Sequence, residues 1–376
     1  MNHYFNPVKI CQGKGCLAKL PDLLQSLVAD KGSDVLLIVW SECVLEHEII
    51  KDLLNKQDGY KVHPVVFTAS NPSVQDLYGV YNHTRKLNLG AVVGIGGGSV
   101  LDVAKSLCCL HDLDISNIDD LRTAIIDKRF TENKMPWIGI PTTAGTGSEV
   151  TCWATIWDPE IEVKRSVESK ENYAYAALID PDLSSTLPLA LAVSSALDAV
   201  AHAVESYWAK ASNCVSKALA LSAIREIMLH IDGLFSDDFA AHDAMSKGSM
   251  LAGLAFSNTK TTACHSISYP LTMHYHIPHG VAVSMLLAPV FTLNLPQIED
   301  PKSLLAALGV KDADEFKARI NGLLTRASIK STLSQWGADK SDIEALVPLC
   351  ITKGRADNNP VLLTNENIAS ILESIY

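Results

Sequence analysis

The chain has 376 residues, of which 48% are hydrophobic, and a formal net charge of −11 at pH 7. We expect two domains with well-buried cores, because a single core rarely grows beyond roughly 250–300 residues. The negative charge argues against a nucleic-acid or anionic-membrane partner, because both need a basic surface on the protein.

The nine cysteines include no Cys-x-x-Cys pair and stand mostly in apolar surroundings. A disulfide framework or a structural zinc site would show regular spacings, so we expect reduced thiols. The N-terminal residues lack the basic stretch and apolar run of a secretory signal peptide. The long apolar stretch 187–204 is interrupted by Asp198 and His202, which argues against a membrane span. These features predict a cytoplasmic protein.

In the first half of the chain, short β-branched runs alternate with helical segments. The runs that indicate buried strands are 34–40, 62–67, 91–95 and 137–140. Strand–helix alternation of this kind predicts an α/β domain with a parallel sheet and helices on both faces.

The pattern changes near residue 186, where long alanine- and leucine-rich segments begin. Their spacing predicts an all-α domain with helices at 187–210, 215–231, 240–256, 303–308, 313–327 and 343–349. Prolines between residues 180 and 188 mark the junction, so we expect one domain at 1–185 and a second at 186–376.

Two loops of the α/β domain have the composition of a nucleotide site. Residues 92–105 combine a strand, three consecutive glycines and a helix start, where free N–H groups can meet a diphosphate. The spacing differs from the GxGxxG fingerprint, so a simple tight turn is the alternative. Residues 141–151 form a threonine- and glycine-rich loop after another strand, for which an ordinary capped turn is the alternative. Both loops in one domain favour dinucleotide binding.

Asp198, His202, His265 and His279 form the candidate metal site. Asp198 and His202 are four residues apart, which places them on one helix face one turn apart. One carboxylate and three imidazoles suit iron or zinc and are too rich in nitrogen for calcium or magnesium. Any one of these histidines alone would more often be an ordinary core or surface residue. Glu205 shares the helix face of Asp198, as a neighbour of the site or as a surface residue.

Six motifs in chain order resemble those of the iron-containing (group III) alcohol dehydrogenases: GGGSVLDVAK (96–105), PTTAGTGSEVT (141–151), DPDL (180–183), ALDAVAHAVESY (196–207), AGLAF (252–256) and IPHG (277–280). The resemblance implies a dehydroquinate synthase-like architecture, in which a Rossmann-like α/β domain binds NAD or NADP and a helical domain binds Fe²⁺, with Zn²⁺ as the alternative. It further implies the reversible reduction of a small aldehyde to its primary alcohol, without a nucleic-acid or membrane partner, by a homodimer.

The resemblance also implies roles for individual residues. Asp198, His202, His265 and His279 match the metal ligands, and the positions that match cofactor contacts are Ser41, Gly97, Gly98, Ser99, Asp102, Thr142, Thr143, Thr146, Lys164 and Leu183. Members that prefer NAD carry an aspartate where this chain has Ser41, or where it has Glu42 if the alignment slips by one. The choice between NAD and NADP therefore stays open.

A second departure from the family is Tyr269, which stands where many members carry a histidine four residues after the third ligand. The position implies a catalytic role in proton relay. The unperturbed pKa of tyrosine, about 10, puts an identical role in doubt.

Residues 261–270 and 354–360 resemble the phosphonoacetaldehyde-reductase branch of the family. This resemblance implies that the substrate pair is phosphonoacetaldehyde and 2-hydroxyethylphosphonate. A phosphonate needs cationic partners, for which Lys260 and Arg355 are the candidates, with two ordinary surface charges as the alternative. Rival functions are a polyol dehydrogenase or a synthase of the same superfold, and a non-catalytic sensor that binds metal and nucleotide.

Overall fold

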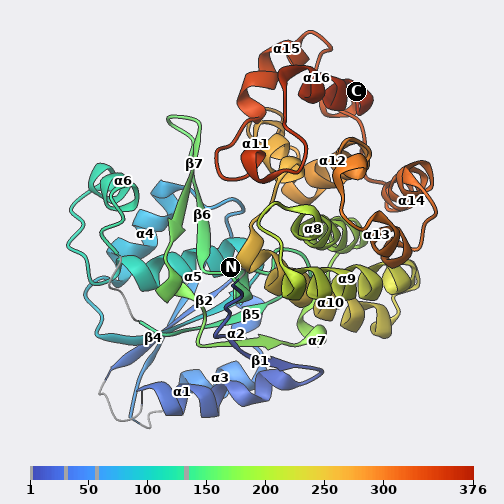
Figure 1. The fold of residues 1–376 in the computed structure, drawn as a ribbon. Helices are drawn as coiled ribbons and strands as arrows, with labels where there is room; N and C mark the ends of the chain where they lie inside the picture. The colour runs from blue at the N-terminus through green and yellow to red at the C-terminus, as the bar shows by residue number, and fades with distance from the viewer. Residues whose placement is uncertain (1–2, 29–32, 56–58, 131–134) are drawn as a thin grey trace. The chain divides into compact units, whose positions relative to one another are not determined.

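The computed structural model describes residues 3–28, 33–55, 59–130 and 135–376. These residues form two compact units (Figure 1). The α/β unit comprises Asn6–Thr143 and Ser148–Ser184. The helical unit comprises Ser185–Tyr376 together with Ala144–Gly147 and the described residues up to Phe5. The threonine-rich loop 141–151 is therefore shared between the two units.

The α/β unit is built on a six-stranded sheet with the order β1-β8-β5-β4-β2-β3, in which every neighbouring pair is parallel. The strands are β1 (Lys9–Gln12), β2 (Asp34–Val39), β3 (Val62–Val66), β4 (Leu89–Gly96), β5 (Trp137–Pro141) and β8 (Ala176–Ile179). The four strands expected from the sequence are all present, and the parallel sheet is confirmed. The outer strand β1 and the inner strand β8 are additional.

Both faces of this sheet are covered because successive side chains of a strand point to opposite sides. Val35, Leu37 and Val39 of β2 join one core with α1 (Leu20–Val28) and α3 (Glu48–Asn55). Leu36 and Ile38 join a second core with helices of the other face, α4 (Val74–Thr84), α5 (Gly98–Leu110) and α6 (Ile118–Ile126). The two helix groups are seen on opposite sides of the sheet in Figure 1.

An antiparallel hairpin, β6 (Trp153–Asp158) and β7 (Val163–Glu168), follows the threonine-rich loop and was not expected from the sequence. The fully buried carboxylate of Asp158 pairs with Arg122 at 2.9 Å and with Arg165 at 2.7 Å. The pair with Arg122 attaches the hairpin to α6, and the pair with Arg165 links its two strands. Two short helices complete the unit, α2 (Glu42–Leu45) after β2 and α7 (Pro181–Ser184) after β8.

The helical unit is all-α over its described residues, as expected. Its helices are α8 (Leu189–Trp208), α9 (Cys214–His230), α10 (Phe239–Thr259), α11 (Ala263–Tyr275), α12 (His279–Asn294), α13 (Pro301–Leu308), α14 (Ala313–Arg326), α15 (Asp342–Leu346) and α16 (Asn365–Ser374). The central helix is α8, which packs against α9, α10 and α12 and is buried almost throughout from Ala192 to its end. Helices α11, α12 and α16 were not expected from the sequence.

Two segments of this unit are long and apolar enough to cross a membrane by length and composition alone. They are Leu189–Trp208 and His279–Gln297, and 78% and 61% of their apolar windows are buried inside the structure. Both segments carry candidate metal ligands in their buried parts or at their ends. Burial of this extent is typical of core helices.

Candidate metal and nucleotide sites

The structure brings together three of the four candidate metal ligands. Asp198 and His202 lie one turn apart on α8, and His265 is supplied by the first turn of α11. Their ligand atoms all lie within 4.8 Å of one another. Asp198 Oδ2 is 4.0 Å from His202 Nδ1, and Asp198 Oδ1 is 3.5 Å from His265 Nε2. All three side chains are buried.

His279, the first residue of α12, lies beside this cluster and outside the 4.8 Å group. Its ring centre is 5.4 Å from that of His265, and the side chain is half-buried. His279 therefore lies next to the three central residues without joining their group of ligand atoms.

The three central residues fit a divalent metal ion. Among the described residues, the buried atoms Asp198 Oδ1 and His265 Nε2 have no hydrogen-bond partner, and a cation between them would satisfy both. Burial pushes the pKa of Asp198 upward, but the imidazoles of His202, His265 and His279 outweigh it and hold the pKa below its usual range. Burial lowers the pKa of His202 to about 4 against the charge of Asp198. An ionised carboxylate beside a neutral imidazole is the state that binds metal.

The structure gives Glu205 a definite place next to the cluster. Its side chain is fully buried on the same face of α8 and accepts a hydrogen bond from His265 Nδ1. It also accepts hydrogen bonds from the backbone N–H of Thr262 at 3.0 Å and of Cys264 at 2.8 Å. The signal in the sequence is the seven-residue separation from Asp198, two helical turns along one face.

Tyr269 and Arg355 lie on the side of the cluster where His279 stands. The ring of Tyr269 stacks on that of His279, with centres 6.2 Å apart and planes inclined by 15°. The Arg355 guanidinium is 5.8 Å from the centre of the Tyr269 ring and donates to Thr261 Oγ1 at 3.1 Å. Burial raises the pKa of Tyr269, and Arg355 opposes this shift only in part. Lys260 is half-buried at the end of α10.

Most of the expected cofactor residues lie at the carboxyl ends of adjacent parallel strands, where open α/β sheets bind ligands. Ser41 follows β2 and caps α2, Leu183 follows β8, and Thr142 and Thr143 follow β5. Gly97 caps the N-terminus of α5, whose first residues are Gly98 and Ser99. A Cβ atom on Gly97 would stand 3.2 Å from the side chain of Thr143, so the two loops are closely apposed.

Asp102, Lys164 and Thr146 are placed differently. Asp102 Oδ1 accepts from Ser148 Oγ at 2.6 Å, and Oδ2 accepts from Thr155 N–H at 2.8 Å, so the carboxylate is already engaged by the loop and the hairpin. Lys164 lies on β7 and acts electrostatically on Asp102. Thr146 belongs to the helical unit.

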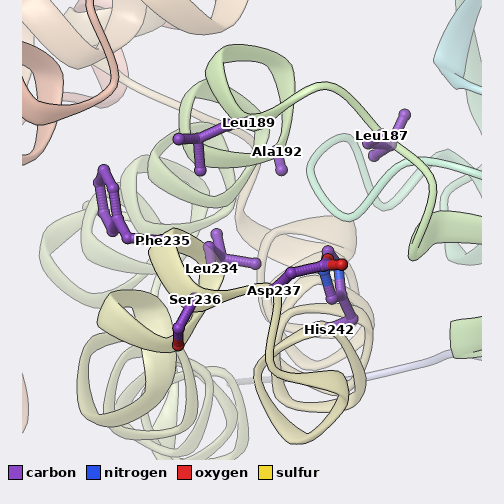
Figure 2. A pocket seen from close by; sticks show the side chains of 8 residues that line it. All are labelled: Leu187, Leu189, Ala192, Leu234, Phe235, Ser236, Asp237 and His242. Carbon is purple, nitrogen blue, oxygen red and sulfur yellow. The ribbon is translucent and has the colours of Figure 1, made fainter.

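A separate pocket of about 420 Å³ lies on the helical unit and is shown in Figure 2. Its walls are the side chains of Leu187, Leu189, Ala192, Leu234 and Phe235, and Ser236, Asp237 and His242 complete the lining. Asp237 and His242 lie against each other, with Oδ1 and Nε2 3.2 Å apart. None of the expected site residues lines this pocket.

Comparison with known proteins identifies the family of the chain. Residues 7–181 match the family model "Iron-containing alcohol dehydrogenase", and residues 192–376 match the model of the C-terminal part of the Fe-containing alcohol dehydrogenase family. The chain is 26% identical to the NADPH-dependent butanol dehydrogenase of Clostridium saccharobutylicum, over 100% of this chain and 98% of the relative. It is 29% identical to the sulfoacetaldehyde reductase of Bilophila wadsworthia, over 81% of each protein.

Among solved structures, the sulfoacetaldehyde reductase of Bifidobacterium kashiwanohense in complex with NAD⁺ matches with a TM-score of 0.86 and 25% identity, over 100% of this chain and 98% of the other. Both family models, which together span nearly the whole chain, and the shared fold lead to one conclusion. The chain belongs to the iron-containing alcohol dehydrogenase family of NAD(P)-dependent oxidoreductases, which interconvert alcohols and aldehydes.

Proposed function

We propose that the protein reduces a small aldehyde that carries an anionic group, with phosphonoacetaldehyde and 2-hydroxyethylphosphonate as the substrate pair. The observation that carries this proposal is the position of Arg355, whose guanidinium stands over the ring of Tyr269, which in turn stacks on His279. Arg355 is thus separated from His279 by the Tyr269 ring. A substrate with an aldehyde at the metal cluster could place an anionic group at its other end near Arg355.

Asp198, His202, His265 and His279 are the proposed metal ligands. Asp198 Oδ1 and His265 Nε2, which have no hydrogen-bond partner among the described residues, support this assignment. When bound, Fe²⁺ or Zn²⁺ supplies Lewis-acid polarisation of the aldehyde oxygen. The residues themselves bring the negative charge and the neutral nitrogens that hold a divalent cation.

For the cofactor, we propose that the strand ends after β2, β4, β5 and β8 bind NAD or NADP. The N-terminus of α5 offers backbone N–H groups to the diphosphate. Ser41 lacks the carboxylate that would repel a 2′-phosphate, so NADP is an acceptable cofactor. The relatives include a protein named as NADPH-dependent and one solved with NAD⁺. The ratio of kcat/KM with the two cofactors decides between them.

The anion anchor is proposed to consist of Arg355 and Lys260. Arg355 is partly buried and donates to Thr261 Oγ1. The planar guanidinium has five N–H donors and suits a tetrahedral anion. Lys260 is the neighbour of Thr261 in the chain and carries the second positive charge. The sulfoacetaldehyde reductases among the relatives are named for a substrate with a tetrahedral anionic group beside an aldehyde.

The substrate proposal is tested by kcat/KM for phosphonoacetaldehyde, sulfoacetaldehyde and uncharged propanal in the wild type and in Arg355→Met. We expect the wild type to have a higher kcat/KM for the anionic aldehydes than for propanal. In the variant, kcat/KM for the anionic aldehydes should fall on the order of 10- to 100-fold and kcat/KM for propanal should stay unchanged, because only the anions contact the guanidinium. Arg326→Met is the matched control, since Arg326 also stacks on an aromatic ring, that of Phe235 at 3.9 Å. Equal efficiency of the wild type on phosphonoacetaldehyde and propanal would contradict the proposal.

We also propose a cytoplasmic homodimer that pairs through the outer strand β1, with neither nucleic acid nor membrane as a partner. An outer strand offers its second edge to another chain, and the net charge of −11 disfavours polyanionic partners. The mass of the protein in solution tests the assembly.

A further inference from the structure

Both carboxylate oxygens of Glu205 accept hydrogen bonds from the start of α11, next to the candidate metal site. Its Oε1 accepts from Thr262 N–H at 3.0 Å, from Thr262 Oγ1 at 2.7 Å and from Cys264 N–H at 2.8 Å. Its Oε2 accepts from His265 Nδ1. Thr262 is the residue that precedes α11, so a carboxylate of α8 takes the place of the side chain that would normally cap α11.

The contact with His265 determines which ring nitrogen carries the proton. An ionised carboxylate only accepts hydrogen bonds, so Nδ1 must carry hydrogen. In the neutral imidazole this leaves Nε2 with a lone pair, and Nε2 is the atom that stands 3.5 Å from Asp198 Oδ1. Histidine ligands of metal sites are commonly oriented in this way by a carboxylate behind them.

We propose that Glu205 is a positioning residue of the metal site, which fixes the tautomer and the orientation of His265 and thereby sets the affinity for the metal. The inference deepens the proposed function and rests on its metal site. Glu205 acts through His265 and does not itself touch the metal.

Two further residues of α8 hold the turn between α10 and α11. The position of this turn therefore does not depend on Glu205 alone. Ser206 Oγ accepts from Thr259 Oγ1 at 3.0 Å, and Trp208 Nε1 donates to Thr262 Oγ1 at 2.8 Å. Between them Lys260 has φ +62° and ψ −177°, a conformation that non-glycine residues rarely adopt. The turn is therefore held at several points, and we expect it to persist when Glu205 alone is changed.

The test is the affinity for Zn²⁺, measured by competition with a chelator, and the visible absorption of bound Co²⁺ in the wild type and in Glu205→Gln. The glutamine amide can donate to Nδ1 of His265, which would place the ring proton on Nε2, the atom that should bind the metal. We expect Zn²⁺ to bind roughly 10- to 100-fold more weakly, with an altered Co²⁺ spectrum and unchanged affinity for NADPH. Glu205→Asp keeps the carboxylate on a shorter side chain, and we expect its Zn²⁺ affinity to lie between those of the wild type and Glu205→Gln.

The matched control is Thr262→Val, which removes the hydroxyl contacts to Glu205 and Trp208 and keeps the carboxylate behind His265. We expect this variant to be less stable and to bind Zn²⁺ with nearly the wild-type affinity. Wild-type affinity in Glu205→Gln would overturn the inference, and so would equal losses of affinity and thermal stability in both variants. A wild-type protein that binds neither Zn²⁺ nor Co²⁺ would instead contradict the proposed metal site itself.

Discussion

The carboxyl group of Glu149 is a buried acid in the part of the threonine-rich loop that belongs to the α/β unit. Its side chain is only 2% exposed, and Oε2 has no hydrogen-bond partner among the described residues. Burial raises the pKa of Glu149 to about 7, although a backbone hydrogen bond and the charge of Lys105 both oppose the shift. The folded protein therefore holds a proton on Glu149 that the unfolded chain releases near pH 4.5. The contribution of Glu149 to stability therefore falls as the pH rises from about 4.5 to about 7, because in this window the unfolded chain does not hold the proton on Glu149 that the folded protein holds.

Replacement of Glu149 by glutamine removes the free-energy cost of burying an ionised carboxylate at high pH. At pH 5 we expect Glu149→Gln to be about as stable as the wild type, whereas at pH 8 it should be more stable by about 3 kcal/mol. Urea unfolding of both proteins at the two pH values measures the difference. Glu344→Gln, on an exposed residue of α15, serves as the control and should show no such pH-dependent gain. The same gain in the control would mean that general charge, and not burial of Glu149, is responsible.

At the residue scale, the sequence predicts side chains that lie close together along one helix better than contacts between distant segments. The four-residue step from Asp198 to His202 implies a shared face, and the structure has them on that face. The approach of His265 depends on the packing of α11 against α8, which no local pattern encodes. His265 was assigned to the same site as Asp198 only because the motifs resemble those of the family. The hydrogen bonds of Glu205 to the start of α11 belong to the same kind of long-range contact.

At the element scale, Gly147 limits how the threonine-rich loop can lie on the helical unit. Its φ is +57°, and a Cβ atom would stand 2.5 Å from Cα of Gly253 in α10. We expect Gly147→Ala to cost at least about 1–2 kcal/mol from the backbone conformation, with the clash in addition. It should also weaken the binding of NADPH, because Thr146 is its neighbour and a proposed cofactor contact. Unfolding midpoints and NADPH titration measure both effects.

The control for this prediction is Gly322→Ala in α14. Beyond the adjoining backbone of its own helix, no described atom lies within 4 Å of the Cβ position at Gly322, and this residue is inside α14. Alanine should stabilise this helix by up to about 1 kcal/mol without an effect on NADPH binding. A Gly147→Ala protein as stable as the wild type would show that the loop adapts to the side chain.

Four of the elements that the sequence did not predict have features that hide them from a local pattern. Strands β1 and β8 have only four residues each, too few for a periodic pattern. Helices α11 and α12 contain Pro270 and Pro289, which usually mark the end of a helix. Both helices are largely buried, so packing within the core sustains them through the proline. Local propensity was a good guide for α8, α9 and α10, where no proline interrupts the pattern.

At the scale of the whole molecule, each unit contributes one half of the proposed chemistry. The α/β unit presents strand ends suited to a nucleotide, and the helical unit holds a buried carboxylate among imidazoles. The metal site has a consequence for stability, because an ion that binds only the folded chain shifts the folding equilibrium toward it. A free ion concentration of 100 times Kd corresponds to about 2.7 kcal/mol.

We therefore expect Zn²⁺ or Fe²⁺ to raise the thermal unfolding temperature by several degrees and a chelator to reverse the change, as measured by calorimetry. Asp198→Asn should abolish the response, because the amide cannot replace the negative ligand. Asp180→Asn is the control, since Asp180 is a buried carboxylate of the α/β unit that accepts from the N–H groups of Gly15 and Leu17. It should lower the unfolding temperature equally with and without metal. A metal response that survives in Asp198→Asn would place the ion elsewhere, and its absence in the wild type would leave the buried cluster with a purely structural role.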